Sequence, residues 1–128
     1  MKALLDTHTF LWWITDDPKI SGTVSHIIKN QDNEIFFSTA SAWEISIKSR
    51  LNRIKLTQMP DIFIPDQLQK NYFQILPIQL NHALKVFSLP AVHNDPFDRI
   101  LIAQSITEDI PLLTADAKMK KYEVKIIW

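Results

Sequence analysis

Short apolar runs of strand length alternate with longer segments of helical periodicity along the chain. The strand-length runs are residues 3–5, 34–38, 73–77, 110–114 and 124–127. The run Ile35-Phe36-Phe37 is continuous rather than alternating, which is typical of a strand buried on both faces. Strands that alternate with helices become parallel neighbours joined by right-handed crossovers. We therefore expect an α/β fold, a three-layer α/β/α sandwich with a central parallel sheet and Rossmann-like topology.

The helical segments are expected at residues 10–14, 18–30, 43–54, 61–72, 80–87 and 95–106. Pro18 suits the first turn of the second helix, because proline is tolerated where the backbone N–H has no helical partner. Pro65 predicts an interruption of the fourth. In the third segment, Trp43, Ile47, Leu51 and Ile54 recur at spacings of four, four and three, which predicts an apolar face directed at the core.

Composition excludes several classes of protein. The 128 residues fit one domain, residues 1–128, and they include no cysteine and a single glycine, Gly22. Without cysteine there is no disulfide framework or thiolate metal site, and without glycine-rich loops there is no P-loop or dinucleotide fingerprint. Fourteen basic and fourteen acidic residues cancel, so any contact with nucleic acid must be local.

No segment approaches the roughly 20 apolar residues of a membrane span. The apolar stretch at the start is broken by Asp6 and His8 and has no small-residue cleavage pattern after it. We therefore expect a soluble cytoplasmic protein with no membrane partner.

Four acidic residues follow predicted strands or open a predicted helix. Asp6 ends the first strand, Glu44 lies early in the helix after the second strand, and Asp116 follows the fourth. Asp98 lies in the first turn of the helix that Asp95-Pro96 opens, so its position depends on how that helix docks. Ligands of open parallel sheets sit beyond the carboxyl ends of the strands. If the four carboxylates converge there, their repulsion requires a cation. Oxygen ligands without cysteine favour Mg²⁺ or Mn²⁺ over Zn²⁺.

Each acid also has a structural interpretation. Asp6 and Asp95 are suitable helix caps, and Asp98 is favoured by the helix dipole in a first turn. Glu44 follows Ser41 at capping-box spacing and precedes Lys48 at the spacing of a helical ion pair. Asp116 fits a turn.

Other residues near these acids have less definite roles. His8 and His93 are candidate general bases, although structural roles are the commoner use of such residues. Arg99, beside Asp98, could neutralise the acids or contact a phosphate, or it could be paired elsewhere. The adjacent Trp12 and Trp13 cannot share one helix face, so one of them could reach a partner.

Four segments in order along the chain carry a family resemblance. They are LLDTHTFLWW, STASAWEISIKSRL, LPAVHNDPFDRILIAQS and LLTADAKMKKYEVKIIW. Together they resemble the PIN-domain ribonucleases, specifically the VapC-like toxins of type II toxin-antitoxin systems. The resemblance implies a PIN-like α/β/α fold and an endoribonuclease dependent on Mg²⁺ or Mn²⁺. It also implies a homodimer and inhibition by a small cognate antitoxin.

The resemblance assigns roles to particular residues. The acids of the family pattern fall on Asp6 in LLDT, Glu44 in SAWEI, Asp98 in DRILIAQS and Asp116 in TAD. Asp6 and Asp98 are expected as direct metal ligands, Asp116 as a third ligand or one acting through water, and Glu44 as a ligand of a second ion or a residue that orients water. Thr114 matches a small hydroxyl residue beside the acids.

Two interpretations of function follow. In the first, the protein hydrolyses RNA phosphodiester bonds, and basic residues near the acids take up the phosphates. Those residues are Lys48, Arg50, Arg53, Lys55, Lys118, Lys120 and Lys121. In the second, it is a non-catalytic α/β binding module whose acids only cap helices. Metal-dependent cleavage separates the two.

Overall fold

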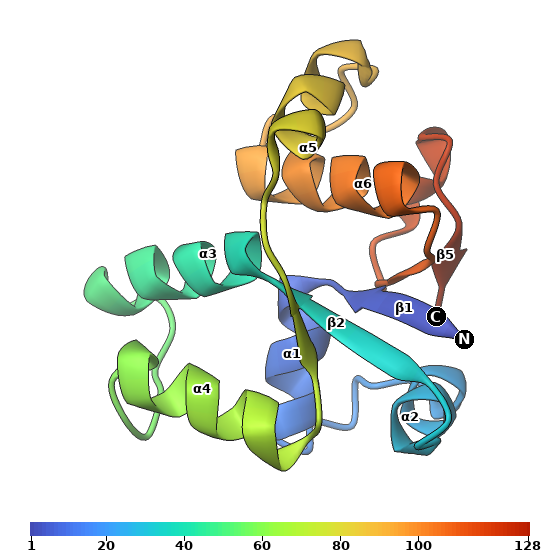
Figure 1. Ribbon diagram of the computed structural model, residues 1–128. Coiled ribbons are helices and arrows are strands. Elements are labelled where there is room, and N and C mark those ends of the chain that lie inside the picture. Colours follow the sequence, from blue (N-terminus) through green and yellow to red (C-terminus); the bar gives the residue numbers. More distant parts are fainter.

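The computed structural model describes residues Met1–Trp128 and contains a five-stranded sheet with helices on both faces (Figure 1). The strands are β1 (Lys2–Leu5), β2 (Glu34–Ser38), β3 (Gln74–Leu76), β4 (Leu112–Leu113) and β5 (Ile126–Ile127). Their order is β3-β2-β1-β4-β5, and every neighbouring pair is parallel. All five predicted strand segments contain a strand, and the predicted α/β fold is confirmed.

Six α-helices and two short 3₁₀ helices connect and cover the strands. They are α1 (Thr7–Ile14), α2 (Gly22–Lys29), α3 (Thr39–Arg50), α4 (Pro60–Lys70), α5 (Leu80–Lys85), η1 (Val86–Ser88), α6 (Pro96–Glu108) and η2 (Ala117–Lys121). In Figure 1, α1, α2 and α4 lie below the sheet, whereas α5 and α6 lie above it. None of these helices combines the length and apolar character needed to cross a bilayer.

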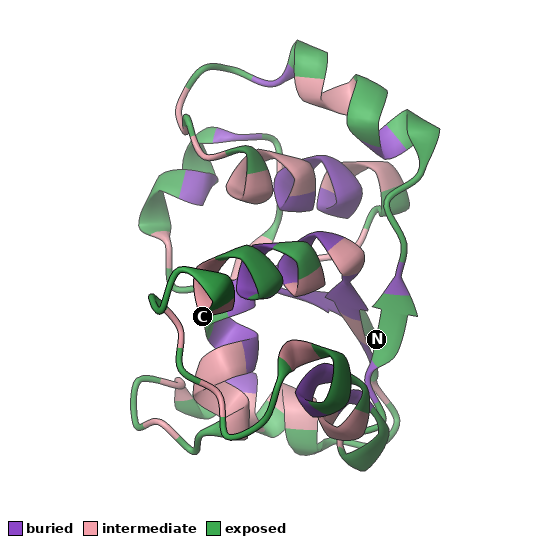
Figure 2. Cartoon of the chain, turned by 90° about the vertical axis from the view of Figure 1, so that its left-hand side faces the viewer, coloured by how far each residue is buried: buried purple, intermediate pink, exposed green.

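The core consists of two apolar clusters, one on each face of the sheet. Alternate side chains of β1 enter different clusters, because successive residues of a strand point to opposite faces. Leu5 packs in the cluster that contains Phe10 of α1, and Leu4 in the cluster that contains Leu101 of α6. Figure 2 shows the buried residues on the strands and on the helices beside them. Burial on both faces explains why the strand sequences are continuously apolar.

The connections at the carboxyl edge of the sheet are very short. Asp6 alone separates β1 from α1, and it is the N-cap residue of α1. Ser38 ends β2 and caps α3, since its hydroxyl accepts the backbone N–H of Ala40 at 3.0 Å. Polar side chains are therefore fixed where the strands end, which is the edge at which ligands of parallel sheets bind.

Two predictions that rested on prolines are wrong. Pro18 lies in a turn rather than in a helix, and α2 begins later because the hydroxyl of Ser21 accepts the N–H of Val24 at 3.1 Å. Pro65 lies inside α4 without interrupting it. The apolar side of α4 is buried and offsets the hydrogen bond that proline cannot make. The buried residues are Phe63, Ile64 and Leu68.

The predicted core face of α3 is also largely wrong: of its four residues, only Ile54, which lies beyond the end of the helix, packs against the core. Trp43, Ile47 and Leu51 have exposed fractions of 60%, 38% and 55%. We call these three residues the α3 stripe. The side of α3 that faces the core carries Ile45 and the polar Glu44 instead, together with Ala40 and Ser41. Because a glutamate lies on the buried side and a tryptophan on the exposed side, the hydrophobic pattern predicts the wrong side of α3 as the core face.

The orientation of α3 can be tested with two isoleucines on the same helix. Ile45→Ala is expected to lower the free energy of unfolding by about 2–5 kcal/mol, because Ile45 is fully buried and its truncation leaves a cavity. Ile47→Ala is expected to cost about 1 kcal/mol or less, since solvent already reaches that side chain. Urea denaturation measures both. Equal losses would mean that α3 is rotated toward the face predicted by the sequence.

Candidate metal-dependent active site

Asp6 lies between β1 and α1 with its carboxylate almost fully buried. Its Oδ1 accepts the backbone N–H of Thr7 at 2.7 Å, which caps α1, and its Oδ2 accepts the hydroxyl of Thr114 at 2.8 Å. A carboxylate oxygen has two lone pairs, so each oxygen retains one. The capping role considered for Asp6 is therefore present, and it leaves the carboxylate able to bind a cation.

Thr114 connects Asp6 to the last of the predicted acids. Its hydroxyl, which donates to Asp6, also accepts the backbone N–H of Asp116 at 3.1 Å. Asp116 in turn caps η2, because its Oδ1 accepts the N–H of Lys118 at 3.0 Å. One buried hydroxyl thus fixes the carboxylate of Asp6 relative to the backbone of Asp116, as expected for a supporting residue beside the acids.

The N-terminus of α6 supplies the other two aspartates. Oδ1 of Asp95 accepts the N–H groups of Phe97 at 2.8 Å and Asp98 at 3.4 Å, so Asp95 is the cap and Pro96 the first helical residue. The sequence predicted Asp95 as a helix cap, and the structure confirms it. Asp98 lies in the first turn of α6, and no hydrogen bond from another side chain occupies its carboxylate.

Three of the four predicted acids surround one hollow of about 350 Å³. They come from three segments far apart in the sequence. The lining consists of Asp6, His8, Trp12, Asp98, Ala115 and Asp116. The sheet topology therefore brings together acids that the sequence separates by up to 110 positions.

Glu44 does not line this hollow. It is buried on α3, and its Oε2 pairs with Nζ of Lys48 at 2.5 Å, which is the predicted helical ion pair. The predicted capping box with Ser41 is wrong: Ser38 caps the helix, and the hydroxyl of Ser41 bonds that of Thr7 at 2.8 Å. Glu44 still acts on the hollow, since its charge is close enough to raise the pKa of Asp6 and Asp98.

The crowding of carboxylates perturbs their ionisation. Burial, and then the negative charges of Asp95 and Asp6, raise the pKa of Asp98 to about 7. Burial also raises the pKa of Asp6, although hydrogen bonds from Thr114 and Thr7 oppose the shift. Carboxyl groups that resist ionisation together are stabilised as anions by a bound cation.

Asp116 shows the opposite behaviour. Partial burial tends to raise its pKa, but the hydrogen bonds from His93 and from the backbone N–H of Lys118 outweigh burial and lower it. Nε2 of His93 lies 2.7 Å from Oδ2 of Asp116. Asp116 is therefore an anion at neutral pH, whereas Asp98 is partly protonated when no metal is bound.

The side chains at the hollow fit a divalent cation. His93, Asp98 and Asp116 each offer a ligand atom, and these atoms all lie within 4.8 Å of one another. Carboxylate oxygens suit Mg²⁺ and Mn²⁺, whereas Nε2 of His93 already bonds Asp116. The donor set thus agrees with the divalent ion expected from the sequence.

Arg99 does not point its terminal nitrogens at the acids or at an open phosphate site. Nη1 donates to the carbonyls of Pro90 at 2.8 Å and His93 at 3.5 Å, and Nη2 to those of Val86 at 3.1 Å and Leu89 at 3.3 Å. Of the interpretations considered for Arg99, pairing elsewhere describes it. It holds residues 86–93 against α6.

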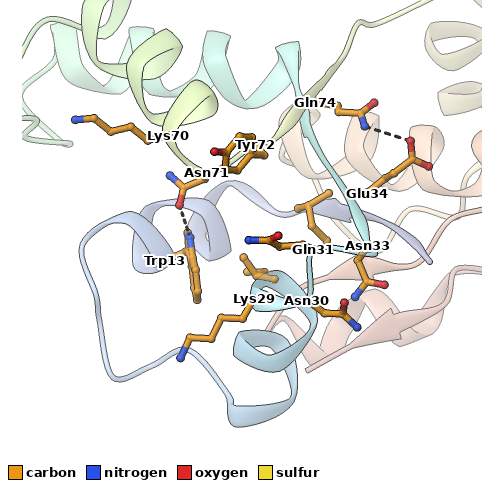
Figure 3. Close-up of a pocket in the computed structure, with 12 residues that line it drawn as sticks. Trp13, Lys29, Asn30, Gln31, Asn33, Glu34, Lys70, Asn71, Tyr72 and Gln74 are labelled. Atoms are coloured by element: carbon orange, nitrogen blue, oxygen red, sulfur yellow. Dashed lines mark hydrogen bonds between the residues drawn. The ribbon is translucent and has the colours of Figure 1, made fainter.

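The two adjacent tryptophans diverge. Trp12 lines the hollow and packs edge-to-face against Trp128, with ring centroids 5.7 Å apart. Trp13 lies elsewhere, and its Nε1 donates to Oδ1 of Asn71 at 2.9 Å. Trp13 and Asn71 belong to a larger hollow of about 690 Å³, lined mostly by amides and lysines (Figure 3). That hollow lies near the starts of β2 and β3, away from Asp6, Asp98 and Asp116. Its lining contains no cluster of acidic side chains.

His93 has a more specific place than the sequence indicated. The sequence shows it only as a histidine five positions before Asp98, with no sign of its contact with Asp116, 23 residues away. Tyr122, which bonds the other side of the ring, carried no sequence signal of function. The contacts of His93 with Asp116 and with Tyr122 depend on how the segment before α6 packs against the segment after β4.

Comparisons with known proteins agree with this architecture. The profile of the PIN domain matches residues 3–125, and the chain belongs to the PIN domain family. The chain is similar to Ribonuclease VapC22 of Mycobacterium tuberculosis, with 27% identity over 121 residues that cover 94% of this chain and 91% of that protein.

Solved structures with the same fold include two complexes. One is VapBC2 from Rickettsia felis bound to a DNA fragment from its promoter, with a TM-score of 0.74, 16% identity, and 99% of this chain and 98% of that chain covered. The other is DNA-bound VapBC from Salmonella typhimurium, with a TM-score of 0.71, 12% identity, and 99% and 97% covered.

The raised pKa of Asp98 predicts a pH-dependent gain in stability for Asp98→Asn. Between the ordinary pKa of 3.8 and the folded pKa of about 7, the folded chain binds more protons than the unfolded chain, so wild-type stability falls as the pH rises. At pH 8 in EDTA, Asp98→Asn is expected to be more stable by on the order of 1–2 kcal/mol, since solvent screens part of the shift. The gain should disappear near pH 3.5. Urea denaturation at both pH values tests this, and a gain independent of pH would contradict it.

Proposed function

We propose that this protein is a metal-dependent endoribonuclease that hydrolyses RNA phosphodiester bonds and acts as the toxin of a type II toxin-antitoxin pair. The observation that carries the proposal is the convergence of Asp6, Asp98 and Asp116 on one hollow. Two of these acids have a raised pKa, and their burial without a counter-charge has a chemical reason if a divalent ion binds there. Membership of the PIN domain family and the similarity to a ribonuclease support the same activity.

The acids would hold Mg²⁺ or Mn²⁺. When bound, such an ion polarises the phosphate, lowers the pKa of water and stabilises the leaving oxygen. Asp6 and Asp98 are proposed as direct ligands, and Asp116 as a third ligand or one that acts through water. Glu44, paired with Lys48 behind the hollow, is proposed to orient water or to serve a second ion.

Substrate binding requires positive charge near this acidic hollow. Lys118, Lys120 and Lys121 are exposed on η2, directly after Asp116. We propose that they contact backbone phosphates, which position RNA without specifying its sequence. The exposed residue Trp43 packs edge-to-face on Phe97, with centroids 5.1 Å apart, and Phe97 precedes Asp98 in the chain.

The alternative is a binding module whose acids only cap helices. Asp6, Asp95 and Asp116 do cap helices, which is the observation in its favour. Capping alone does not explain Asp98, which is partly buried and carries a strongly raised pKa without capping anything. Metal-dependent turnover decides between the two functions.

We propose a small antitoxin as the protein partner. The similar structures from Rickettsia felis and Salmonella typhimurium are VapBC complexes. In this chain the α3 stripe is an exposed apolar surface, and its Trp43 packs on Phe97, which precedes Asp98 in the chain, so we propose that the antitoxin binds there and excludes RNA.

A homodimer is the proposed oligomeric state. Leu80, Leu84 and Phe87 have exposed fractions of 74%, 65% and 96%, and we call them the α5–η1 surface. Large apolar side chains clustered in this way are typical of an interface. The α5–η1 surface lies on consecutive short helices and is separate from the residues that line the hollow.

Asp6→Asn and Asp98→Asn are each expected to reduce metal-dependent RNA cleavage by more than about 100-fold, since even changes to the outer partners of metal ligands cost roughly 10–100-fold. Asp95→Asn is the matched control. Asparagine caps helices as well as aspartate does, so this variant should cleave within a few-fold of wild type. The assay uses a mixed RNA pool with Mg²⁺, Mn²⁺ or EDTA. Normal cleavage by Asp6→Asn and Asp98→Asn would exclude the proposed site.

Leu84→Glu is expected to convert the dimer into a monomer, because it places a charge in the centre of the α5–η1 surface. Light scattering after gel filtration should show twice the chain mass of 14.9 kDa for wild type and a single chain mass for the variant. Ile62→Glu, at an exposed position of α4, is the control and should remain dimeric. A dimer that survives Leu84→Glu would place the contact elsewhere.

A further inference from the structure

A chain of hydrogen bonds leads from the core to the carboxylate of Asp116. The hydroxyl of Tyr122, which is 5% exposed, accepts the backbone N–H of His93 at 2.8 Å and lies 2.9 Å from Nδ1 of the same residue. The two rings are stacked, with centroids 5.4 Å apart. Nε2 of His93 lies 2.7 Å from Oδ2 of Asp116. The imidazole is thus held on one side by Tyr122 and holds Asp116 on the other.

The position of the protons decides which group donates in each of these hydrogen bonds. Oδ1 of Asp116 accepts an N–H from Lys118, and a carboxylate has only acceptor oxygens to offer. The proton between Nε2 and Oδ2 therefore belongs to the imidazole, which donates. The hydroxyl of Tyr122 donates to Nδ1 of a neutral imidazole or accepts from an imidazolium, so the geometry holds in either charge state.

The backbone of His93 is held as firmly as its ring. Nη1 of Arg99 donates to the carbonyls of Pro90 and His93, while the N–H of His93 donates to Tyr122. His93 is consequently fixed at its N–H, its carbonyl and both ring nitrogens. Each oxygen of Asp116 carries one hydrogen bond and has one lone pair left for the hollow.

We propose that Tyr122 and His93 are positioning residues that hold the Asp116 carboxylate in the orientation required to bind the divalent ion. This inference rests on the proposed function. His93 acts through Asp116 rather than as a ligand, because its Nε2 is committed to the carboxylate. Partners of this kind, which orient a ligand without touching the metal, commonly strengthen metal binding by roughly 10–100-fold.

The test is the affinity of the purified full chain for Mn²⁺ without RNA, measured from the electron paramagnetic resonance signal of free Mn²⁺. Tyr122→Phe removes one oxygen and is expected to weaken Mn²⁺ binding about 10-fold. His93→Ala should do the same, and His93→Gln, whose amide can donate to Asp116, should recover part of the loss. Tyr72→Phe and His26→Gln make the same chemical changes at exposed positions remote from the hollow and serve as controls.

A second readout separates positioning from general stability. With RNA, Tyr122→Phe should lower kcat at subsaturating Mn²⁺, leave KM for RNA unchanged, and recover at high Mn²⁺. The pulsed resonance spectrum of bound Mn²⁺ should show no directly coordinated nitrogen. Wild-type Mn²⁺ affinity in folded Tyr122→Phe and His93→Ala would overturn the inference, as would a nitrogen ligand that disappears in His93→Ala.

The failures of the two proposals are distinguishable. A wild-type protein that binds Mn²⁺ but cleaves no RNA overturns the proposed function, while the affinities of the variants still test the positioning role. A protein that binds no Mn²⁺ overturns both.

Discussion

Electrostatic repulsion at the carboxyl edge of the sheet is the constraint on which this structure depends. The parallel order brings the segments after β1 and β4 and the start of α6 together, and each carries an aspartate. Burial and neighbouring charges make ionisation unfavourable there, most strongly at Asp98. The fold tolerates this because the hydrogen bonds of Asp6 and Asp116 stabilise their charged forms, leaving Asp98 as the acid that most requires a cation.

Capping and metal binding are usually weighed as alternatives for an acid at a helix start, yet here the carboxylates that cap helices also line the candidate metal site. Asp6 and Asp116 each use one oxygen to cap the helix that follows. The cap holds one oxygen, and Thr114 for Asp6 or His93 for Asp116 holds the other, so each carboxylate is already oriented without further loss of side-chain entropy. The same short connections that build the fold thereby prepare the proposed site.

The sequence predicted the parts of the structure that depend on local pattern. The strands, the parallel α/β arrangement and the edge position of the acids follow from apolar runs and from residues at strand ends. The side of α3 that faces the core could not be predicted, because the core there accepts Ser41 and Glu44 and leaves Trp43 exposed. Pro65 was misleading for a similar reason, because tertiary packing keeps α4 continuous through it. For Arg99 the sequence allowed pairing but did not identify the backbone carbonyls that it pairs with.

Arg99 connects the first turn of α6 to the segment that precedes this helix. Its guanidinium donates hydrogen bonds to four carbonyls between Val86 and His93, and these bonds hold the segment to α6. Phe87 lies near one end of this segment and His93 at the other. One guanidinium therefore braces both the backbone beside the exposed Phe87 and the backbone of the residue whose imidazole bonds Asp116.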